Sequence, residues 1–327
     1  MLEYEWLTQQ TPQKIYDQLS KSVFGQAAAK TAIAMALFNF VHHRPTNLLL
    51  AGPTGSGKTA LIEAMCEMLN EDMLFVLDGS RLGPDGYKSS THLSDAFENR
   101  DDCHFFLVID EADKLLETHV GSAGTNYSQL AQNQLLLLFE HRKITLSSNA
   151  SKEQPIVADT SHTSIILLGA FENLFTGLNA EKHIGFGENV GTQADYSNTK
   201  ISFQNLVDYG LRSEIAGRID DIVCLNPLSR DDFLRILDTP SMSPISRLER
   251  EYMTHITVSE NLKFNLAQHA VETGLGCRAV YTVLKRMLNN AIFQDCNQSQ
   301  YNLMLPGEES LSQVTRSPAY AFAYADN

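Results

Sequence analysis

Eight consecutive residues in the first quarter of the chain have the types and the order that suit phosphate binding. Glycines let a loop turn tightly, so that its backbone N–H groups and the N-terminus of the next helix can face phosphate oxygens. The lysine would place a positive charge on the β and γ phosphates, and the threonine hydroxyl would hold magnesium. The segment fits G-x-x-x-x-G-K-[ST]. It reads Gly52, Pro53, Thr54, Gly55, Ser56, Gly57, Lys58 and Thr59.

A second motif places two carboxylates at the end of an apolar run, residues 105–109. If this run is a strand beside the one that precedes the glycine-rich loop, Asp110 would reach the magnesium shell and Glu111 would polarise the attacking water. A strand that merely ends in an acidic turn is the alternative, and it is less favoured behind a phosphate-binding loop. The two motifs together predict an enzyme that hydrolyses ATP, with ATP and Mg²⁺ as cofactors.

Two arginines later in the chain stand in glycine-containing segments. Arg218 comes directly after Gly217, and Arg278 ends the tripeptide 276–278, Gly-Cys-Arg. Phosphoryl transfer loads negative charge onto the γ-phosphate oxygens, and a guanidinium can stabilise that charge bidentately. Surface arginines are more often solvated or paired with a carboxylate. From the residues alone, both interpretations of the two arginines stay open.

Short apolar runs alternate with helical periodicity over the first two thirds of the chain, and they supply the elements that would carry these residues. The run 47–51 ends at the glycine-rich loop, and apolar residues at helical spacing follow the loop. Fully apolar strands that alternate with helices predict a parallel sheet covered on both faces. The remaining runs are 74–77, 105–109, 164–168 and 222–225.

The pattern changes at Ser229. This serine, followed by Asp231 and Asp232, has the features of a helix N-cap with carboxylates in the first turn. Helical patterns then dominate, with one further strand expected at 301–305. The sequence therefore predicts three parts, which are an α/β nucleotide-binding domain, a smaller, mostly helical lid domain and a disordered tail. Their expected bounds are 1–228, 229–310 and 311–327.

The composition is that of an ordinary folded protein of about two domains, with 327 residues of which 43% are apolar. A formal net charge of −14 disfavours binding to nucleic acid or to an anionic membrane. No apolar run approaches the roughly 20 residues of a membrane span, and the first residues lack signal-peptide features. The five cysteines are widely spaced, which gives no support for a zinc site. A cytoplasmic location is expected.

With these motifs in this order, the chain resembles the AAA+ ATPases of the Clp/Hsl unfoldase group, most closely its ClpX-like members, over nearly its whole length. The glycine-rich loop corresponds to Walker A, and DEADK, residues 110–114, corresponds to Walker B. Residues 23–26 match a V-x-G-Q motif, which implies that Val23 lies on the adenine side of the nucleotide. The resemblance implies a P-loop NTPase large domain of the AAA+ type, followed by a helical AAA+ lid domain.

The resemblance also gives the two arginines roles. The segment GLRSEIAGRID, residues 210–220, is similar to the arginine-finger box of the group. This implies that Arg218 reaches the ATP of a neighbouring subunit. The tripeptide 276–278 is similar to the sensor 2 motif, which implies that Arg278 contacts phosphate from the lid domain. An arginine that acts in a neighbouring subunit implies a homo-oligomer, which in this group is a hexameric ring.

Two further similarities concern protein substrates. Tyr87 stands in the place of the aromatic pore-loop residue that grips a threaded polypeptide, and its amphipathic ring suits varied side chains. Ile184, Gly185 and Phe186 match a loop by which this group docks on a ClpP-type peptidase. The alternatives are a tyrosine in an ordinary exposed turn and a glycine-rich stretch that packs on its own domain. The resemblance implies an unfoldase and translocase that threads proteins through a ring pore, with a ClpP-type peptidase as a further partner.

Departures from the family pattern keep a second function open. Leu168 stands near the position where sensor 1 is normally polar, which predicts slow hydrolysis. Ser213 and Asp220 replace two prolines of the arginine-finger box, the residues after Tyr87 differ from the pore-loop pattern, and no counterpart of the N-terminal zinc-binding domain is expected. The alternative function is an AAA+ chaperone that remodels or assembles a specific complex without a peptidase. A nucleic-acid motor and a small-molecule kinase fit the charge and the motifs less well.

Overall fold

The computed structural model of the protein describes residues 4–82, 92–97, 103–115, 127–146, 156–182, 196, 199–305 and 319–320. Three predicted features lie wholly or mostly outside these residues: the pore-loop residue Tyr87, the docking segment Ile184, Gly185 and Phe186, and the disordered tail 311–327. The first two stay predictions, and so does the tail apart from residues 319–320, which form a short strand instead. The helices within the described ranges are all too short or too polar to span a bilayer.

The chain divides into two compact units, each with its own core. The division after Asn226 falls close to Ser229, where the sequence pattern changes. The first unit is made of Met1–Ser20, Gln26–Pro53 and Gly57–Asn226. The second is made of Pro227–Asn327 and two short segments, Lys21–Gly25 and Thr54–Ser56.

The first unit is built on a five-stranded sheet in which all neighbouring strands run parallel. Every residue of its two central strands β1 and β6 is buried, because helices cover both faces of the sheet. The predicted α/β fold is confirmed, and each strand begins and ends within one residue of its predicted bounds. The strands are β1 (Asn47–Ala51), β2 (Leu74–Asp78), β3 (Phe106–Asp110), β6 (Ser164–Gly169) and β7 (Asp221–Cys224).

The strand order corrects one prediction. The order is β2-β3-β6-β1-β7, so β3 does not lie next to β1 as expected. Instead β6 lies between them, with Leu168 opposite Leu50 of β1 and Leu167 opposite Ile109 of β3. Four consecutive apolar residues, 165–168, let β6 occupy this central, fully buried position. The end of β3 is therefore two strand spacings, roughly 10 Å, from the end of β1.

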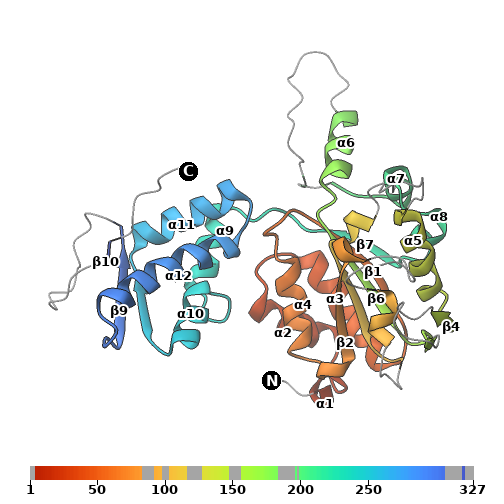
Figure 1. Ribbon diagram of the computed structural model, residues 1–327, viewed down its shortest axis with the longest axis horizontal. Coiled ribbons are helices and arrows are strands. Elements are labelled where there is room, and N and C mark those ends of the chain that lie inside the picture. The colour runs from red at the N-terminus through yellow and green to blue at the C-terminus, as the bar shows by residue number, and fades with distance from the viewer. Residues whose placement is uncertain are drawn as a thin grey trace. The chain divides into compact units, whose positions relative to one another are not determined.

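Helices lie on both sides of this sheet. Figure 1 shows α2, α3 and α4 on one side and α5, α7 and α8 on the other. The helices up to residue 216 are α1 (Tyr4–Leu7), α2 (Pro12–Ser22), α3 (Ala27–Val41), α4 (Lys58–Cys66), α5 (Tyr127–Leu138), α6 (Glu172–Lys182), α7 (Phe203–Tyr209) and α8 (Ser213–Ala216). Short 3₁₀ turns η1 (Glu71–Met73), η2 (Gly79–Arg81), η3 (Leu93–Phe97) and η4 (Ala112–Leu115) and the antiparallel pair β4 (Lys143–Leu146) and β5 (Ile156–Asp159) complete the described elements.

The second unit packs four helices against a small sheet around its own apolar core. The helices are α9 (Arg230–Asp238), α10 (Pro244–Tyr252), α11 (Glu260–Thr273) and α12 (Cys277–Gln294), and the strands are β8 (His255–Val258), β9 (Gln300–Met304) and β10 (Ala319–Tyr320). The strand predicted at 301–305 is present as β9. The sequence predicts neither β8 nor β10. β8 buries only every second residue and so lacks the continuous apolar run that marks the other strands, and β10 has only two residues.

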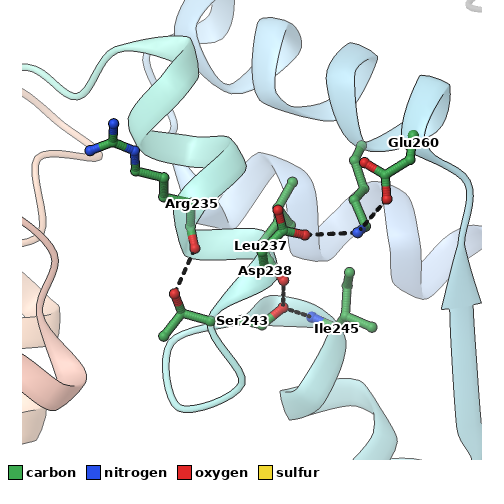
Figure 2. A network of polar contacts seen from close by, with 8 residues as sticks. Arg235, Leu237, Asp238, Ser243, Ile245 and Glu260 are labelled. Atoms are coloured by element: carbon green, nitrogen blue, oxygen red, sulfur yellow. Dashed lines mark hydrogen bonds and ion pairs between the residues drawn. The ribbon is translucent and has the colours of Figure 1, made fainter.

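Local polar contacts explain where the helices of the second unit begin and end. Ser229 caps α9 as predicted: its Oγ accepts the Asp232 N–H at 3.2 Å, and Asp232 Oδ2 accepts the Ser229 N–H at 2.9 Å. Figure 2 shows the next connection, where Ser243 Oγ donates to the Leu237 carbonyl at 2.7 Å and accepts the Ile245 N–H at 3.2 Å. One buried hydroxyl thus ends α9 and begins α10.

Candidate functional site

The glycine-rich loop connects β1 to α4, as the sequence predicts. Gly57, with φ of 98°, directly precedes α4, and Gly55 has φ of 78°. Glycine adopts such left-handed conformations without the steric cost that a Cβ would bring. The N-cap residue Gly57 has no side chain to cap α4, which suits N–H groups of the first turn that would face an anion.

Lys58 is the first residue of α4, and its ammonium turns back towards the loop. Its Nζ donates hydrogen bonds to the carbonyl oxygens of Gly52 and Pro53, the second at 2.9 Å. Burial lowers the pKa of Lys58 to about 8, although nearby carboxylates oppose the shift. A partly desolvated cation among carboxylates marks the carboxyl-terminal edge of the sheet as a chemical site. The carboxylates are Asp110, Asp113 and Glu172.

Asp110 ends β3, and Glu111 follows it in a strained backbone conformation. The φ of Glu111 is 52°, in the left-handed region that residues with a side chain rarely adopt. Asp110 Oδ1 accepts the N–H of Glu111 at 2.9 Å, and the Glu111 carbonyl accepts the N–H of Lys114 at 3.0 Å. Glu111 is exposed. The turn therefore holds the Glu111 carboxylate at the edge of the sheet, where water can reach it.

Gly79, which follows β2, lies directly against this turn. A Cβ on Gly79 would stand 2.8 Å from the carbonyl oxygens of both Asp110 and Glu111. Only a residue without a side chain leaves room for this approach. The neighbouring strand therefore supports the strained conformation of Glu111. The sequence does not reveal this role of Gly79, since a glycine after a strand carries no chemical signal of its own.

The region after β6 supplies polar groups that the sequence analysis also missed. Leu168 is 2% exposed and belongs to the core of the sheet, so it offers no polar group. Asp113, which is 6% exposed, accepts the N–H of Phe171 at 3.3 Å and joins η4 to the end of β6. Glu172 begins α6 directly afterwards. Asp113 lies inside the DEADK motif, which was the available signal.

Thr59 and Asp110 offer the oxygen donors that suit a magnesium ion. Thr59 is exposed in the first turn of α4, and Asp110 is half-buried at the end of β3. Among the described residues, the Asp110 carboxylate accepts one hydrogen bond, on Oδ1, which leaves Oδ2 available. Hydroxyl and carboxylate oxygens are hard ligands of the kind that Mg²⁺ prefers, with phosphate and water completing its shell.

Arg218 is held at the opposite edge of the same sheet. Its carbonyl accepts a hydrogen bond from Asn47 Nδ2 at 3.0 Å, where β1 begins. Asp220 Oδ2 accepts the Asn47 N–H at 2.7 Å, and the Asp220 N–H donates to the Asn47 carbonyl at 2.8 Å. A proline at position 220 could not make the second of these bonds. Lys58 follows the far end of β1, roughly 16 Å away along five residues of strand, so the structure does not bring Arg218 and Lys58 together.

Arg278 and Val23 both belong to the second unit. Arg278 is exposed in the first turn of α12, and its carbonyl accepts the Thr282 hydroxyl at 2.9 Å. Val23 is 3% exposed, and the neighbouring Phe24 packs against the apolar core of the second unit. Their predicted nucleotide contacts stay predictions.

Comparison with known proteins places this geometry in a family. Residues 48–174 match the model of the ATPase family associated with various cellular activities (AAA). The chain is similar to the ATP-dependent Clp protease ATP-binding subunit ClpX of Treponema denticola, with 25% identity across 87% of this chain and 77% of the relative. ClpX 2 of Wolinella succinogenes is 24% identical across 96% of this chain and 83% of its own length.

The mitochondrial ATP-dependent clpX-like chaperone of Saccharomyces cerevisiae is 25% identical across 82% of this chain and 63% of the relative. This chain is a ClpX-like AAA+ ATPase. The matched residues 48–174 contain Lys58, Asp110 and Glu111, so ATP is the nucleotide of this ClpX-like ATPase and its hydrolysis is the reaction. The match ends before Arg218 and Arg278.

Proposed function

We propose that this ClpX-like ATPase unfolds proteins and threads them through the pore of a hexameric ring, driven by ATP hydrolysed at subunit interfaces. The observation that carries the proposal is the position of Arg218. It is anchored at the start of β1, whereas Lys58 and Glu111 stand at the other edge of the sheet. An arginine finger in this position is too far from its own nucleotide and needs a second copy of the chain.

Within one subunit, the loop and Lys58 bind the phosphates. A pKa of about 8 leaves most of the Lys58 side chains charged at pH 7, so the ammonium can exchange its loop carbonyls for phosphate oxygens. Thr59 and Asp110 are the residues that would hold Mg²⁺. When it is bound, the ion neutralises charge on the β and γ phosphates.

Glu111 is the proposed general base. Its exposed carboxylate orients the attacking water and accepts its proton, which contributes most when the carboxylate is fixed in direction. The left-handed backbone of Glu111, the hydrogen bond to Asp110 and the close contact with Gly79 supply that fixation. The cost of the strained conformation is borne by the surrounding fold.

The arginines complete the proposed site. Arg218 would place its guanidinium on the γ-phosphate of the adjacent subunit, where negative charge accumulates during transfer. Arg278 is proposed as a phosphate contact, and Val23 as an adenine contact, by their similarity to family motifs. A head-to-tail interface of this kind repeats around a ring until it closes.

Protein substrates and a peptidase form the finer part of the proposal. The relatives are named as ATP-binding subunits of an ATP-dependent Clp protease. By the same similarity, Tyr87 would grip the threaded chain, and Ile184, Gly185 and Phe186 would dock on a ClpP-type peptidase.

A remodelling chaperone without a peptidase is the second candidate. Leu168 favours it, because a buried apolar side chain cannot position the attacking water as a polar sensor 1 residue does. Slow turnover suits an ATPase that assembles or rearranges one complex more than one that degrades many substrates.

The test is ATP-dependent unfolding of a fluorescent protein with an unstructured tag, with and without a ClpP-type peptidase. We expect fluorescence to fall in both cases and degradation only with the peptidase. Tyr87→Ala should abolish unfolding while ATP turnover continues, and deletion of residues 184–186 should abolish degradation alone. Unfolding that never leads to degradation would favour the remodelling chaperone, and turnover without any unfolding would contradict the proposal.

A further inference from the structure

Helix α5 connects two parts of the first unit that the proposed mechanism treats separately. One is η4, which directly follows Glu111 and ends at Leu115. The other is the arginine-finger box, residues 210–220, which carries Arg218. No motif of the sequence falls on α5, and none of the proposed catalytic residues lies on it.

A buried amide on α5 bonds to both parts. Gln132 is 3% exposed, and its Nε2 donates to the Leu115 carbonyl at 3.4 Å and to the Gly210 carbonyl at 3.2 Å. Its Oε1 accepts the N–H of Arg212 at 3.1 Å. The side chain thus uses both N–H groups and its oxygen, which fixes its orientation. A buried amide with partners on three segments keeps those segments in register, since breaking any bond leaves a polar group unsatisfied.

Two further contacts join α5 to the finger box, one near each end of the box. Asn133 Oδ1, beside Gln132, accepts a hydrogen bond from the Arg212 guanidinium. One turn further on, the Leu136 carbonyl accepts from Arg218 Nη1 at 3.4 Å. Arg212 precedes α8 and Arg218 follows it, so the whole short helix lies between two attachments to α5.

We propose that Gln132 is a positioning residue that couples the finger of a subunit to the state of its own nucleotide site. A shift of the Glu111–Leu115 segment during hydrolysis reaches Gln132 through the Leu115 carbonyl. It passes from there to Gly210 and Arg212 and so to Arg218. The finger then acts on the neighbouring subunit according to what its own subunit has bound. This inference rests on the proposed function, because it needs Arg218 to act in a neighbour.

Gln132→Met tests the coupling, because it keeps the length of the side chain and removes all three hydrogen bonds. We expect the Hill coefficient of ATP hydrolysis to fall towards 1, with the KM for ATP changed less than kcat. Gln132→Glu keeps the acceptor for the Arg212 N–H and should fall between the wild type and Gln132→Met. Thr163→Val is the matched control: it loses one partly buried hydrogen bond, from Thr163 Oγ1 to the Cys103 carbonyl at 2.9 Å, at the other edge of the sheet. If Gln132 is only structural, Gln132→Met and the control Thr163→Val should both lower thermal stability, and neither should change the Hill coefficient.

Mixed rings then show whether the effect crosses the interface. Wild-type chain is mixed with a large excess of Glu111→Gln chain, which cannot turn over but still offers its finger, and turnover per wild-type chain is measured. The same excess is repeated with Glu111→Gln/Gln132→Met and with Glu111→Gln/Arg218→Ala. We expect turnover to fall about fivefold further with the Gln132→Met double variant than with Glu111→Gln alone, and to fall most with the Arg218→Ala double variant.

The outcomes separate the two claims. If the Arg218→Ala double variant acts no differently from Glu111→Gln alone, no finger crosses the interface and the proposed function fails. If the Arg218→Ala double variant lowers turnover but the Gln132→Met double variant matches Glu111→Gln alone, Arg218 does act across the interface. The coupling through Gln132 is then overturned.

Discussion

The two edges of one parallel sheet use similar polar residues for different tasks. At the amino-terminal edge, side chains serve the backbone: the Thr46 N–H donates to Ser164 Oγ at 3.0 Å, and Asn47 bonds to Arg218 and Asp220. At the carboxyl-terminal edge, Lys58 is desolvated and Glu111 is strained and exposed. Polar groups at the first edge are used to fix the backbone, whereas those at the second keep charge and hydrogen-bonding capacity for a ligand.

Arg218 combines the two tasks, because its backbone serves the fold and its side chain is proposed to act on the nucleotide. Its carbonyl is fixed at the structural edge by Asn47, whereas within the described part of the chain its guanidinium makes one long hydrogen bond, to the Leu136 carbonyl at 3.4 Å. The fold therefore holds the backbone of this residue and leaves most of the guanidinium's five donors for another partner. The comparison predicts that substitutions at the two edges differ in kind: one edge changes turnover, and the other changes stability.

The largest effect is expected at Glu111. Glu111→Gln keeps the size of the side chain and removes the base, so kcat should fall by about 10²- to 10⁴-fold while ATP binding persists. Turnover and nucleotide affinity, measured on the same preparation, check this. A kcat within threefold of the wild type would remove Glu111 from the mechanism.

Gly79→Ala should have the next largest effect. Its new Cβ must displace the Asp110 and Glu111 carbonyls, which approach to 2.8 Å, and a misplaced base lowers kcat by about tenfold to a hundredfold. Gly177→Ala is the matched control, since a Cβ there meets no atom within 4 Å. If Gly79→Ala and Gly177→Ala have the same kcat, the proposal that Gly79 supports the conformation of Glu111 is wrong.

The pH dependence of ATP binding should follow Lys58. Because burial lowers its pKa from 10.5 to about 8, the nucleotide-free protein loses this proton as the pH rises through 8. Phosphate binding needs the charged form, whose fraction falls from about a half at pH 8 to about a tenth at pH 9, so the KM for ATP should rise about fivefold over this interval. The same pKa shift has the opposite effect on stability. The unfolded chain keeps the Lys58 proton up to about pH 10.5, whereas the folded protein loses it near pH 8. The free energy of unfolding therefore rises with pH between about 8 and 10.5.

Lys58→Arg is the control for this pH profile. A guanidinium stays charged at every pH in this range. The variant should therefore bind ATP more weakly, with a KM that does not change between about pH 7.5 and about pH 9.5, on either side of the Lys58 pKa. A wild-type KM that is equally flat would show that Lys58 is not the titrating group.

The smallest effect on turnover is expected at the structural edge. Thr163→Val leaves the Cys103 carbonyl without its hydroxyl partner and should lower the free energy of unfolding by about 1–2 kcal/mol. The kcat should stay within twofold, because Thr163 lies at the other end of β6 from the nucleotide. Denaturant unfolding measures the loss of stability, and turnover is measured on the same variant. A large loss of kcat would contradict the expected difference between the two edges of the sheet.

Much of the fold could be predicted because the sequence marks it locally. Residues 47–51 are fully apolar and run into a glycine-rich loop, so one short segment specifies strand, loop and helix together. Asp110 and Glu111 are adjacent in the chain and need no tertiary information to be paired. Ser229 predicts the start of α9 for the same reason.

What the sequence could not predict depends on contacts between distant segments. The insertion of β6 between β1 and β3 follows from tertiary packing, and no local pattern encodes it. Gly79 matters only because the Walker B turn lies against it. Gln132 looks like one more polar residue on a helix until its three partners, far apart in the chain, are known.

The central claim is that one subunit supplies the phosphate loop and the base while its neighbour supplies Arg218. It is tested most directly by mixing two inactive variants, Arg218→Ala and Glu111→Gln, in equal amounts. In random mixed rings, about a quarter of the sites pair an intact base with an intact finger from the adjacent subunit, so about a quarter of wild-type turnover should return. A mixture no more active than the average of the two variants alone would contradict the account.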